Sequence, residues 1–218
     1  MRVRRRDDIG ERGLPDESPE VSWSPARQRF SEQVKLLVKA LRSTDESVHE
    51  LAVVQITLLG PKVVPYLTSA LEEALEESEL SESATESPPG AERAIHGVCS
   101  ALGIIRDADS VIDLAAALPR KEAVEALAKI GGDRALDLII DTIESDSALG
   151  DPLRSYRGHS SWPSSSADAD PEFVRRVFLR FGEVGKKRLQ EELESGSGSR
   201  RAAIAEIIRI LEDPEGLP

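Results

Sequence analysis

The sequence predicts an all-α fold, an α-α superhelix built from about four to five short helix pairs. Aromatic residues make up only 4% of the chain, so its core must consist of Ala, Leu, Ile and Val, which suit helix-on-helix packing better than a β-sandwich. Two further observations point the same way. An apolar stripe of helical period ends repeatedly at a turn, and an apolar triplet follows the turn.

The first predicted element is a helix in "SWSPARQRFSEQVKLLVKALR", ahead of the repeats. Ser24 is expected to cap it and Pro25 to occupy its first position, where the fixed φ and missing N–H of proline are tolerated. Apolar residues follow at helical spacing: Phe30, Val34, Leu37 and Leu41. We expect this helix to cover the open end of the first repeat, as the terminal caps of solenoids do.

The first helix of each pair is marked by apolar residues at i, i+4 and i+7, which share one face of an α-helix. In "EAVEALAKIGG" these are Ala123, Leu127 and Ile130. Four other segments carry the same stripe: Ala52, Ile56, Leu59; Val98, Leu102, Ile105; Val174, Phe178, Phe181; and Ile204, Ile208, Leu211.

The second helix of each pair is marked by an apolar triplet at i, i+3 and i+7. The triplets are Val64, Leu67, Leu71; Val111, Leu114, Leu118; and Leu136, Ile139, Ile143. A fourth copy keeps Leu189 and Leu193 but has Lys186 in the first place. Gly60-Pro61, Gly131-Gly132 and Gly182 stand where the chain must reverse, because glycine tolerates positive φ and proline can open a new helix.

The pairs are too short to fold alone. The step between the second and third units, from Ile105 to Ile130, is 25 residues. A unit of about 30 residues lies below the roughly 40 at which a chain can usually bury enough surface to be stable. Each pair must therefore be stacked on its neighbours, as in an α-solenoid.

Three segments resemble HEAT repeats of the short type found in phycocyanobilin lyases, within the armadillo-type superfamily: "EALAKIGGDRALDLIIDTI", "SALGIIRDADSVIDLAAAL" and "ITLLGPKVVPYLTSAL". The resemblance covers residues 45–213, with units at 45–77, 91–118, 120–145 and 170–195 and a half unit at 199–213. It implies a solenoid over 23–213, preceded by an arm at 1–22 and interrupted by an acidic linker at 78–90 and a long loop at 146–169. Proteins with such repeats include adaptors, lyases, hydroxylases and nucleic-acid enzymes, so the resemblance implies a fold more than an activity.

Composition bounds the setting. With 40 acidic and 28 basic residues the formal charge is −12, which argues against a general nucleic-acid coat. "MRVRRRDDIG" is not followed by an apolar segment, so no secretory signal is expected, and no apolar run is long enough to cross a membrane. Cys99 is the only cysteine, so there can be no internal disulfide. A cytoplasmic protein without a membrane partner is expected.

Candidate catalytic residues are few. HEAT-like hydroxylases hold a di-iron centre with several His-Glu dyads, but His49-Glu50 is the only dyad here, so we expect His49 to be a partly exposed structural residue. Cys99 has no basic neighbour to lower the pKa of its thiol and is expected to be buried and inert. His159 lies in the long loop with no regular structure to hold a triad around it. We therefore expect no enzyme activity, no cofactor and no metal.

Two further sets of residues are candidates for partner binding: a group of carboxylates on the second helices and a pair of aromatic residues in the long loop. Carboxylates of the second helices are expected to line one face, which in a solenoid is usually the concave binding face; the alternative is an ordinary solvated surface. They are Asp113, Asp137 and Asp141, with Glu144. In the long loop, Tyr156 and Trp162 stand in a polar setting, where they either pin the loop to the array or dock a partner.

Basic residues gather at both ends of the chain. Arg175, Arg176, Lys187 and Arg188 make the last units cationic, and Arg2, Arg4, Arg5 and Arg6 form a basic tip on the arm. They suit a contact with nucleic acid, although the aromatic residues that a HEAT-like DNA glycosylase cleft would need are missing. The alternative is ion pairing with neighbouring helices.

The sequence therefore predicts a non-enzymatic interaction module, an adaptor or scaffold that binds another protein through its concave face, arm or loop. A nucleic-acid or ribosome-associated module that uses the arm and the C-terminal basic face is one alternative. A lyase-like or accessory protein that holds a small molecule in its groove is the other.

Overall fold

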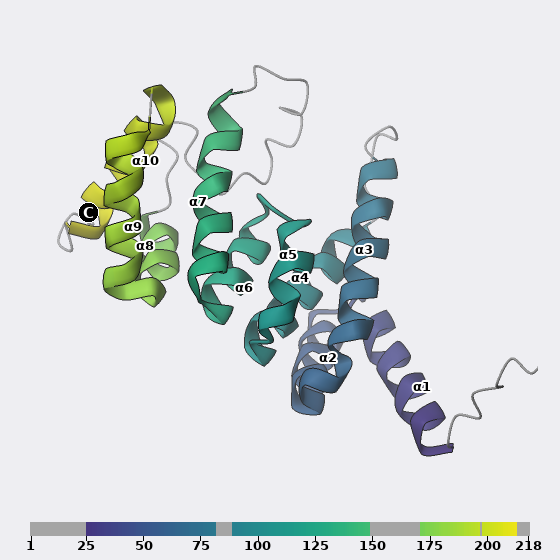
Figure 1. Cartoon of the computed structure of the whole chain (residues 1–218). Helices are drawn as coiled ribbons and strands as arrows, with labels where there is room; N and C mark the ends of the chain where they lie inside the picture. Colours follow the sequence, from purple (N-terminus) through teal and green to yellow (C-terminus); the bar gives the residue numbers. More distant parts are fainter. Residues whose placement is uncertain (1–24, 82–88, 149–170, 197, 213–218) are drawn as a thin grey trace, which may run out of the picture.

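The computed structural model describes residues 25–81, 89–148, 171–196 and 198–212, and the regular elements in these ranges are all helices. They lie side by side from α1 at one end to α10 at the other (Figure 1). In order they are α1 (Pro25–Ala40), α2 (Glu46–Leu59), α3 (Val64–Ser81), α4 (Pro89–Ile105), α5 (Val111–Ala115), α6 (Lys121–Ile130), α7 (Asp133–Ala148), α8 (Pro171–Phe178), α9 (Gly182–Ser195) and α10 (Gly198–Glu212). Three 3-10 turns intervene: η1 (Gly60–Val63), η2 (Ala108–Ser110) and η4 (Leu179–Phe181).

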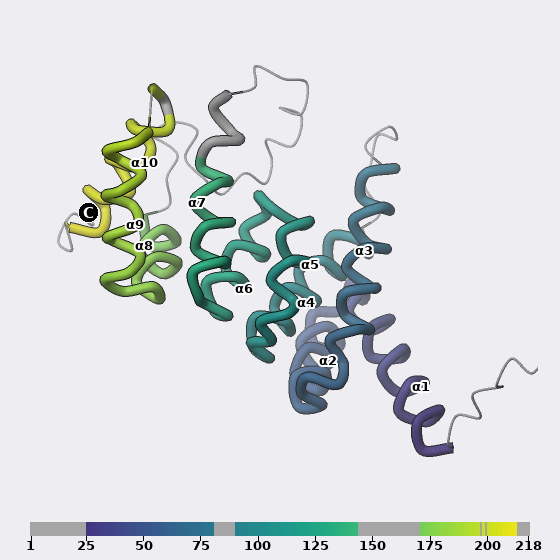
Figure 2. Tube along the Cα trace, viewed as in Figure 1, coloured from purple at the N-terminus to yellow at the C-terminus, as the bar shows by residue number. Residues whose placement is uncertain are grey.

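The pairs stack as a superhelix. The first helices α2, α4, α6 and α8 pack one against the next and form a continuous row. The second helices reach across to the following pair, α3 packing on α4 and α5 on α6. Figure 2 follows the chain through this array. The predicted all-α superhelical fold is confirmed.

Helix α1 covers the first pair. It packs against both α2 and α3, and Val34 and Leu41 are fully buried there. The ring of Phe30 meets Tyr66 of α3 edge-on, with centroids 6.3 Å apart. Pro25 opens the helix, as its missing N–H allows. The helix therefore lies at the end of the array that the sequence assigns to a cap.

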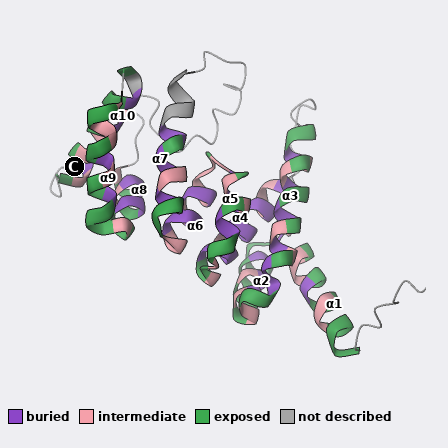
Figure 3. Cartoon of the chain, viewed as in Figure 1, coloured by how far each residue is buried: buried purple, intermediate pink, exposed green. Residues whose placement is uncertain are grey.

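The apolar stripes form the core between the helices, where Figure 3 shows the buried residues. The first two members of the stripes in α2, α4, α6 and α8 are buried, and the third member is half-buried next to the turn. In α10 the prediction is wrong in part. Ile204, Ile207 and Ile210 are buried there, whereas the predicted Ile208 and Leu211 are half-buried, because α10 packs on helices of two different pairs.

The residue that ends each first helix has a φ in the left-handed range in all four pairs. Its φ is +69° at Gly60, +77° at Gly131 and +55° at Gly182, and the equivalent in the second pair is Arg106, with φ +57°. The N–H of Arg106 donates to the carbonyl of Leu102 at 2.9 Å, as Gly131 donates to Leu127 at 2.8 Å. In the first and fourth pairs the N–H of Gly60 and Gly182 donates instead to the residue three positions earlier, Thr57 and Leu179. The positive φ is therefore kept in every pair, even where the sequence lacks its glycine.

The second pair is shorter than its sequence pattern indicates. Helix α5 ends at Ala115, so Leu118 of the predicted triplet lies in the turn that follows and is only half-buried. Leu118 precedes Pro119, and the ring of a proline disfavours helical geometry in the residue before it. Val111 and Leu114 are buried as predicted.

The two interruptions begin later than the sequence suggests. Helix α3 continues to Ser81 and α4 begins at Pro89, so the linker drawn at 78–90 is shorter at both ends. Ser78 is buried because its hydroxyl donates to Glu92 at 2.8 Å and accepts from Arg120 at 2.9 Å. Helix α7 runs to Ala148, two residues past the predicted start of the long loop.

Helix α10 turns back toward the array. It packs against α8 and α9, as the first helix of a fifth unit would, but it also packs against α7. Arg200 at its start is buried and reaches Glu192 of α9 at 2.6 Å and Asp141 of α7 at 3.9 Å. One guanidinium thus joins three helices.

By length and composition alone, Glu46–Leu80 is the one stretch of the described residues apolar enough to cross a membrane. In this fold it is two helices, α2 and α3, separated by η1. The 14 residues of α2 span about 21 Å, less than the roughly 30 Å of a bilayer core. Ile56 and Leu67 from this stretch are fully buried against other helices.

We predict that the Arg106→Gly variant is more stable than the Arg106→Ala variant, which is the reverse of the usual order in a helix. Alanine in the left-handed region costs about 1–2 kcal/mol, whereas glycine does not. Urea denaturation of Arg106→Gly and Arg106→Ala should therefore give a larger free energy of unfolding for the glycine variant, by about 1 kcal/mol. A more stable alanine variant would contradict the left-handed turn.

Candidate interaction surface

The outward side of the first-helix row carries exposed apolar residues at its N-terminal end. On α2, Leu51, Val54 and Leu58 are 57%, 53% and 80% exposed. Their spacing of three and four residues places them on one side of the helix, away from the buried Ala52 and Ile56. Helix α2 is thus apolar on two sides, of which only one is covered.

One exposed position of the repeat changes from apolar to cationic along the row. Counting two residues back from the left-handed turn residue gives Leu58, Ile104, Lys129 and Arg180 in the four successive pairs. Ile104 is 52% exposed. Six residues before the turn residue, the repeat equivalents of Val54 are Ser100, Glu125 and Arg176. We call these side chains the first-helix face: Leu51, Val54, Leu58, Ile104, Lys129, Arg176 and Arg180.

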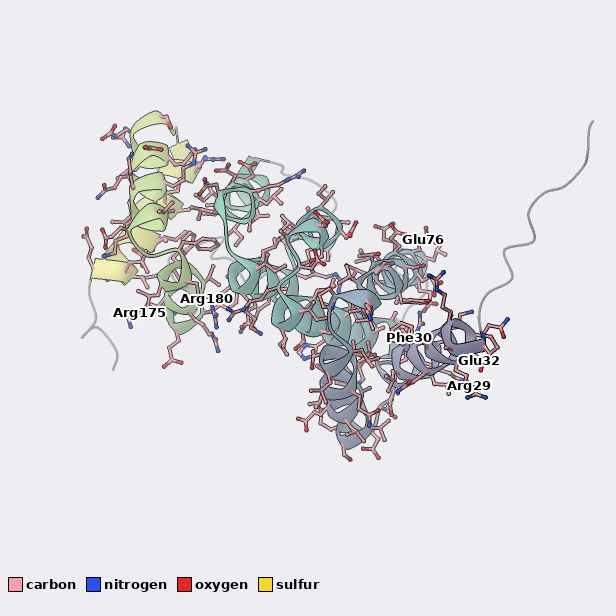
Figure 4. All side chains as sticks on the ribbon, turned by 60° about the horizontal axis from the view of Figure 1, so that its bottom comes forward. Arg29, Phe30, Glu32, Glu76, Arg175 and Arg180 are labelled. Atoms are coloured by element: carbon pink, nitrogen blue, oxygen red, sulfur yellow. The ribbon has the colours of Figure 1, made fainter. Side chains whose placement is uncertain are left out.

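The cations at the far end of this face are lightly engaged. Figure 4 shows Arg180 at the end of the array opposite Arg29 and Glu32 of α1. Lys129 and Arg180 form no ion pair with any described residue, and Arg176 lies 3.8 Å from Glu125. Lys129 packs its stem beside Gly103 of α4, where a Cβ would meet its Cδ at 3.2 Å. A shallow hollow lies between α6 and α8 at Lys129, Arg176 and Arg180.

The other predicted basic residues are paired within the array. Arg188 donates to Asp137 of α7 at 3.0 Å and lies 3.4 Å and 3.5 Å from Glu191 and Glu192, and these hydrogen bonds and charges raise the pKa of its guanidinium. Lys187 lies 3.7 Å from Glu191. Arg175 donates to the carbonyl of Ile210 at 2.9 Å.

The carboxylates predicted to form a binding face are divided by the same contacts. Asp137 and Asp141 of α7 face the C-terminal helices, through Arg188 and Arg200. Asp113 of α5 is half-buried one helix pair away. Asp137 and Asp141 thus serve contacts within the array, and the role of the three carboxylates in partner binding stays a prediction.

Several predicted residues lie outside the described parts of the chain. They are Arg2, Arg4, Arg5 and Arg6 of the arm, and Tyr156, His159 and Trp162 of the long loop. The side chain of Glu144 is also outside the description.

A polar cavity of about 330 Å³ lies between the N-terminal ends of α2, α4 and α6. Two ion pairs cross it, Glu46 with Arg93 and Glu92 with Arg120. Glu46 has a lowered pKa because it accepts a hydrogen bond from Arg93. Much of the charge that lines the cavity is therefore already neutralised by its own neighbours.

His49 lies at the base of this cavity and is buried, so the prediction of a partly exposed side chain is wrong. Its Nδ1 donates to the carbonyl of Leu41 at 2.9 Å, because a carbonyl can only accept. Gly97 makes room for it, since a Cβ there would stand 2.9 Å from Cε1 of the ring. Sequence reasoning missed this burial because the covering residues come from α1 and α4.

His96 is the other imidazole at the cavity, 5.7 Å from His49 between ring centroids. Its Nδ1 lies 3.6 Å from Oε1 of Glu122, and this ion-pair contact raises the pKa of His96 and lowers the pKa of Glu122. Among the described residues no group of three or more His, Cys, Asp or Glu side chains is placed to hold a metal ion. Burial raises the pKa of the Cys99 thiol to about 12, so the thiol is protonated and buried as the sequence indicates.

Sequence reasoning did not identify the exposed side of α2. The signal was present, because "ESVHELAVVQITLL" is apolar on nearly all sides, more than one buried stripe requires. Lys129 was also missed, since in the sequence it is a single lysine between apolar residues.

The sequence model of the PBS lyase HEAT-like repeat matches residues 119–145, the third helix pair. No curated protein and no solved structure shows significant similarity to the chain. The match falls on the unit whose turn, stripe and triplet are the most regular, and it confirms the HEAT-like resemblance there.

We predict that the His96–Glu122 pair adds stability between about pH 4.5 and 6.5, the ordinary pKa values of the two groups. The raised pKa of His96 contributes stability that is fully present at pH values below the ordinary pKa of histidine. This stability is lost as the pH rises through the pKa of His96 in the folded state. The lowered pKa of Glu122 contributes stability that is fully present at pH values above the ordinary pKa of glutamate. This stability is lost as the pH falls through the pKa of Glu122 in the folded state. Urea denaturation should show Glu122→Gln less stable than wild type at pH 6, by a few tenths of a kcal/mol for so exposed a pair. The difference in free energy of unfolding between wild type and Glu122→Gln should be smaller at pH 8. An equal difference at the two pH values would contradict the pairing.

We predict that two adjacent arginines differ in their contribution to stability. Arg200→Met should lower the free energy of unfolding by about 1–2 kcal/mol, because Glu192 would lose its 2.6 Å contact to Arg200 and keep only the longer 3.5 Å contact to Arg188. Arg201→Met, at an exposed neighbour, should change it by less than about 0.5 kcal/mol. Denaturation midpoints measure both, and equal effects would show that Arg200 does not anchor α10.

Proposed function

We propose that this chain, a HEAT-like repeat protein, is a non-enzymatic module that binds another protein through its first-helix face. The observation that carries the proposal is the exposed apolar side of α2, with Leu58 80% exposed. Burying a leucine side chain fully is worth about 1.5–3 kcal/mol, so a partner that covers Leu51, Val54 and Leu58 gains several kcal/mol. Scattered apolar residues are ordinary on protein surfaces, but a contiguous stripe is typical of an interaction site.

The position of this stripe supports the proposal. Each of α4, α6 and α8 has a preceding first helix beside it in the row, whereas α2 begins the row and has α1 as its neighbour. Helix α1 packs on α2 and α3 but leaves Leu51 and Leu58 more than half exposed. The stripe therefore lies on a side of α2 that its neighbours in the array leave uncovered.

The two alternatives have weaker support. For nucleic acid, Arg175 and Arg188 are engaged within the array, which reduces the number of cations available to phosphates. For a small molecule, the cavity at His49 and His96 is the specific observation in favour, and a polar compound with a carboxylate and a donor would suit its walls. Its ion pairs Glu46–Arg93 and Glu92–Arg120 would have to open for such a ligand to bind them.

We predict that the stripe decides which protein is captured. The purified full chain should recover one partner from a native extract, and the double variant Leu51→Ser, Leu58→Ser should recover it at least about tenfold less, since two apolar anchors are lost. The matched control is Ile112→Ser, Val184→Ser, at two apolar positions elsewhere that are 55% and 58% exposed, close to the 57% of Leu51. Quantitative mass spectrometry gives the recoveries, and circular dichroism checks that both variants keep their helices.

Two outcomes would contradict the proposal. Equal recovery by the stripe variant and the control would show that α2 is not the binding surface. Loss of the captured material after nuclease treatment would favour the nucleic-acid alternative.

A further inference from the structure

From the gradient along the first-helix face we infer the chemistry of the partner: a short segment of another protein that has apolar residues in one half and carboxylates in the other. The apolar half lies over α2 and α4, and the carboxylates meet Lys129 and Arg180. This inference rests on the proposed function, which names the surface but not the ligand.

The length of the segment follows from the stacking. Leu58, Ile104 and Lys129 occupy equivalent positions on α2, α4 and α6, which pack in succession. Arg180 follows in η4, which packs on α6, so the four side chains form a line across the row. Packed helices lie about 8–10 Å apart, so three steps span about 24–30 Å. An extended peptide covers this distance in about nine residues, at roughly 3.3 Å per residue.

The apolar half of the line is defined by side chains that are exposed but have no polar function. Leu51, Val54 and Leu58 form one side of α2, and Ile104 follows on α4. None of them can hydrogen-bond, so only apolar groups of a partner gain by covering them. A phosphate backbone would lose hydration there without a compensating contact, which favours a protein segment over RNA or DNA.

The cationic half selects carboxylates. Lys129 and Arg180 have no anionic partner among the described residues, and the single neighbouring contact of Arg176, to Glu125, is long at 3.8 Å. The whole chain carries −12, so these cations are a local exception in a negative field. Such a field repels a polyanion at long range but tolerates two or three carboxylates that pair directly with the cations.

A lipid surface is the competing occupant for an apolar helix side. The exposed Glu46 and Glu50 lie on the same helix as the stripe, and the negative charge of the chain opposes an anionic bilayer. The charge pattern thus favours the protein segment, and vesicles become one arm of the test.

The test begins with a displayed library of random 16-residue peptides, selected on the full-length chain. We expect the enriched peptides to carry two or more large apolar residues and two or more Asp or Glu in separate halves of a nine-residue window. A synthetic enriched peptide should bind, by fluorescence anisotropy, about tenfold more weakly in 0.5 M than in 0.1 M salt. No enrichment, or enriched peptides without acidic residues, would overturn the inference.

Two variants then assign the halves. Lys129→Met, Arg180→Gln removes both charges but keeps the stems that pack on the helices, and should weaken the peptide about tenfold. The same variant should bind a second peptide, in which Gln replaces each acidic residue, with the affinity of wild type. The control Lys186→Gln, Lys187→Gln removes two exposed charges from α9 and should bind like wild type. Equal binding of the acidic peptide by the two charge variants would overturn the inference.

The remaining arms separate this inference from the proposed function. Binding of a 20-nucleotide RNA or of phosphatidylcholine–phosphatidylserine vesicles, lost in Leu51→Ser, Leu58→Ser, would overturn the inference in favour of that ligand. If the native partner is captured through the α2 stripe but is indifferent to Lys129→Met, Arg180→Gln, the chemistry inferred here is wrong and the proposed function stands. If neither variant affects capture, both fail.

Discussion

The structure depends on apolar stripes that can be buried only by the next helix pair. Ala123 and Leu127 of α6 are fully buried because α4 and α7 cover them, and α6 alone has only ten residues. An isolated helix of that length is marginal in water, so the stacking supplies most of its stability. This constraint explains why the repeats are regular where they touch and variable where they do not.

Polar residues supplement the stacking at places where the repeat pattern is interrupted. Ser78, Glu92 and Arg120 connect the end of α3, the start of α4 and the start of α6, around the gap in the described chain after Ser81. At the other end Arg200 connects α7, α9 and α10, which lie on either side of the second gap. Because these groups are partly buried, each needs its partner more than an exposed ion pair would.

Contacts within the array also limit which residues are available to a partner. Most of the basic residues of the last units serve contacts within the array, and so do Asp137 and Asp141 of α7. In the described part of the chain, the first-helix face makes few such contacts. It has apolar side chains at α2 and cations at α6 and η4. The proposed binding surface therefore consists of positions that stacking does not use, and solenoid surfaces generally serve recognition.

The sequence by itself determined the fold class, the stripes of the first four pairs, the glycine turns and the helix ahead of the array, because each depends on local spacing. Leu127, Leu67 and Gly131 could be assigned from neighbours within one or two helical turns. Only tertiary structure decided the burial of His49, the core role of Ser78 and the pairing of Arg188 with Asp137, because their partners are 8 to 51 residues away in sequence. It also separated the two apolar sides of α2, since the pattern "ESVHELAVVQITLL" marks both as apolar and only the packing of neighbouring helices covers one of them.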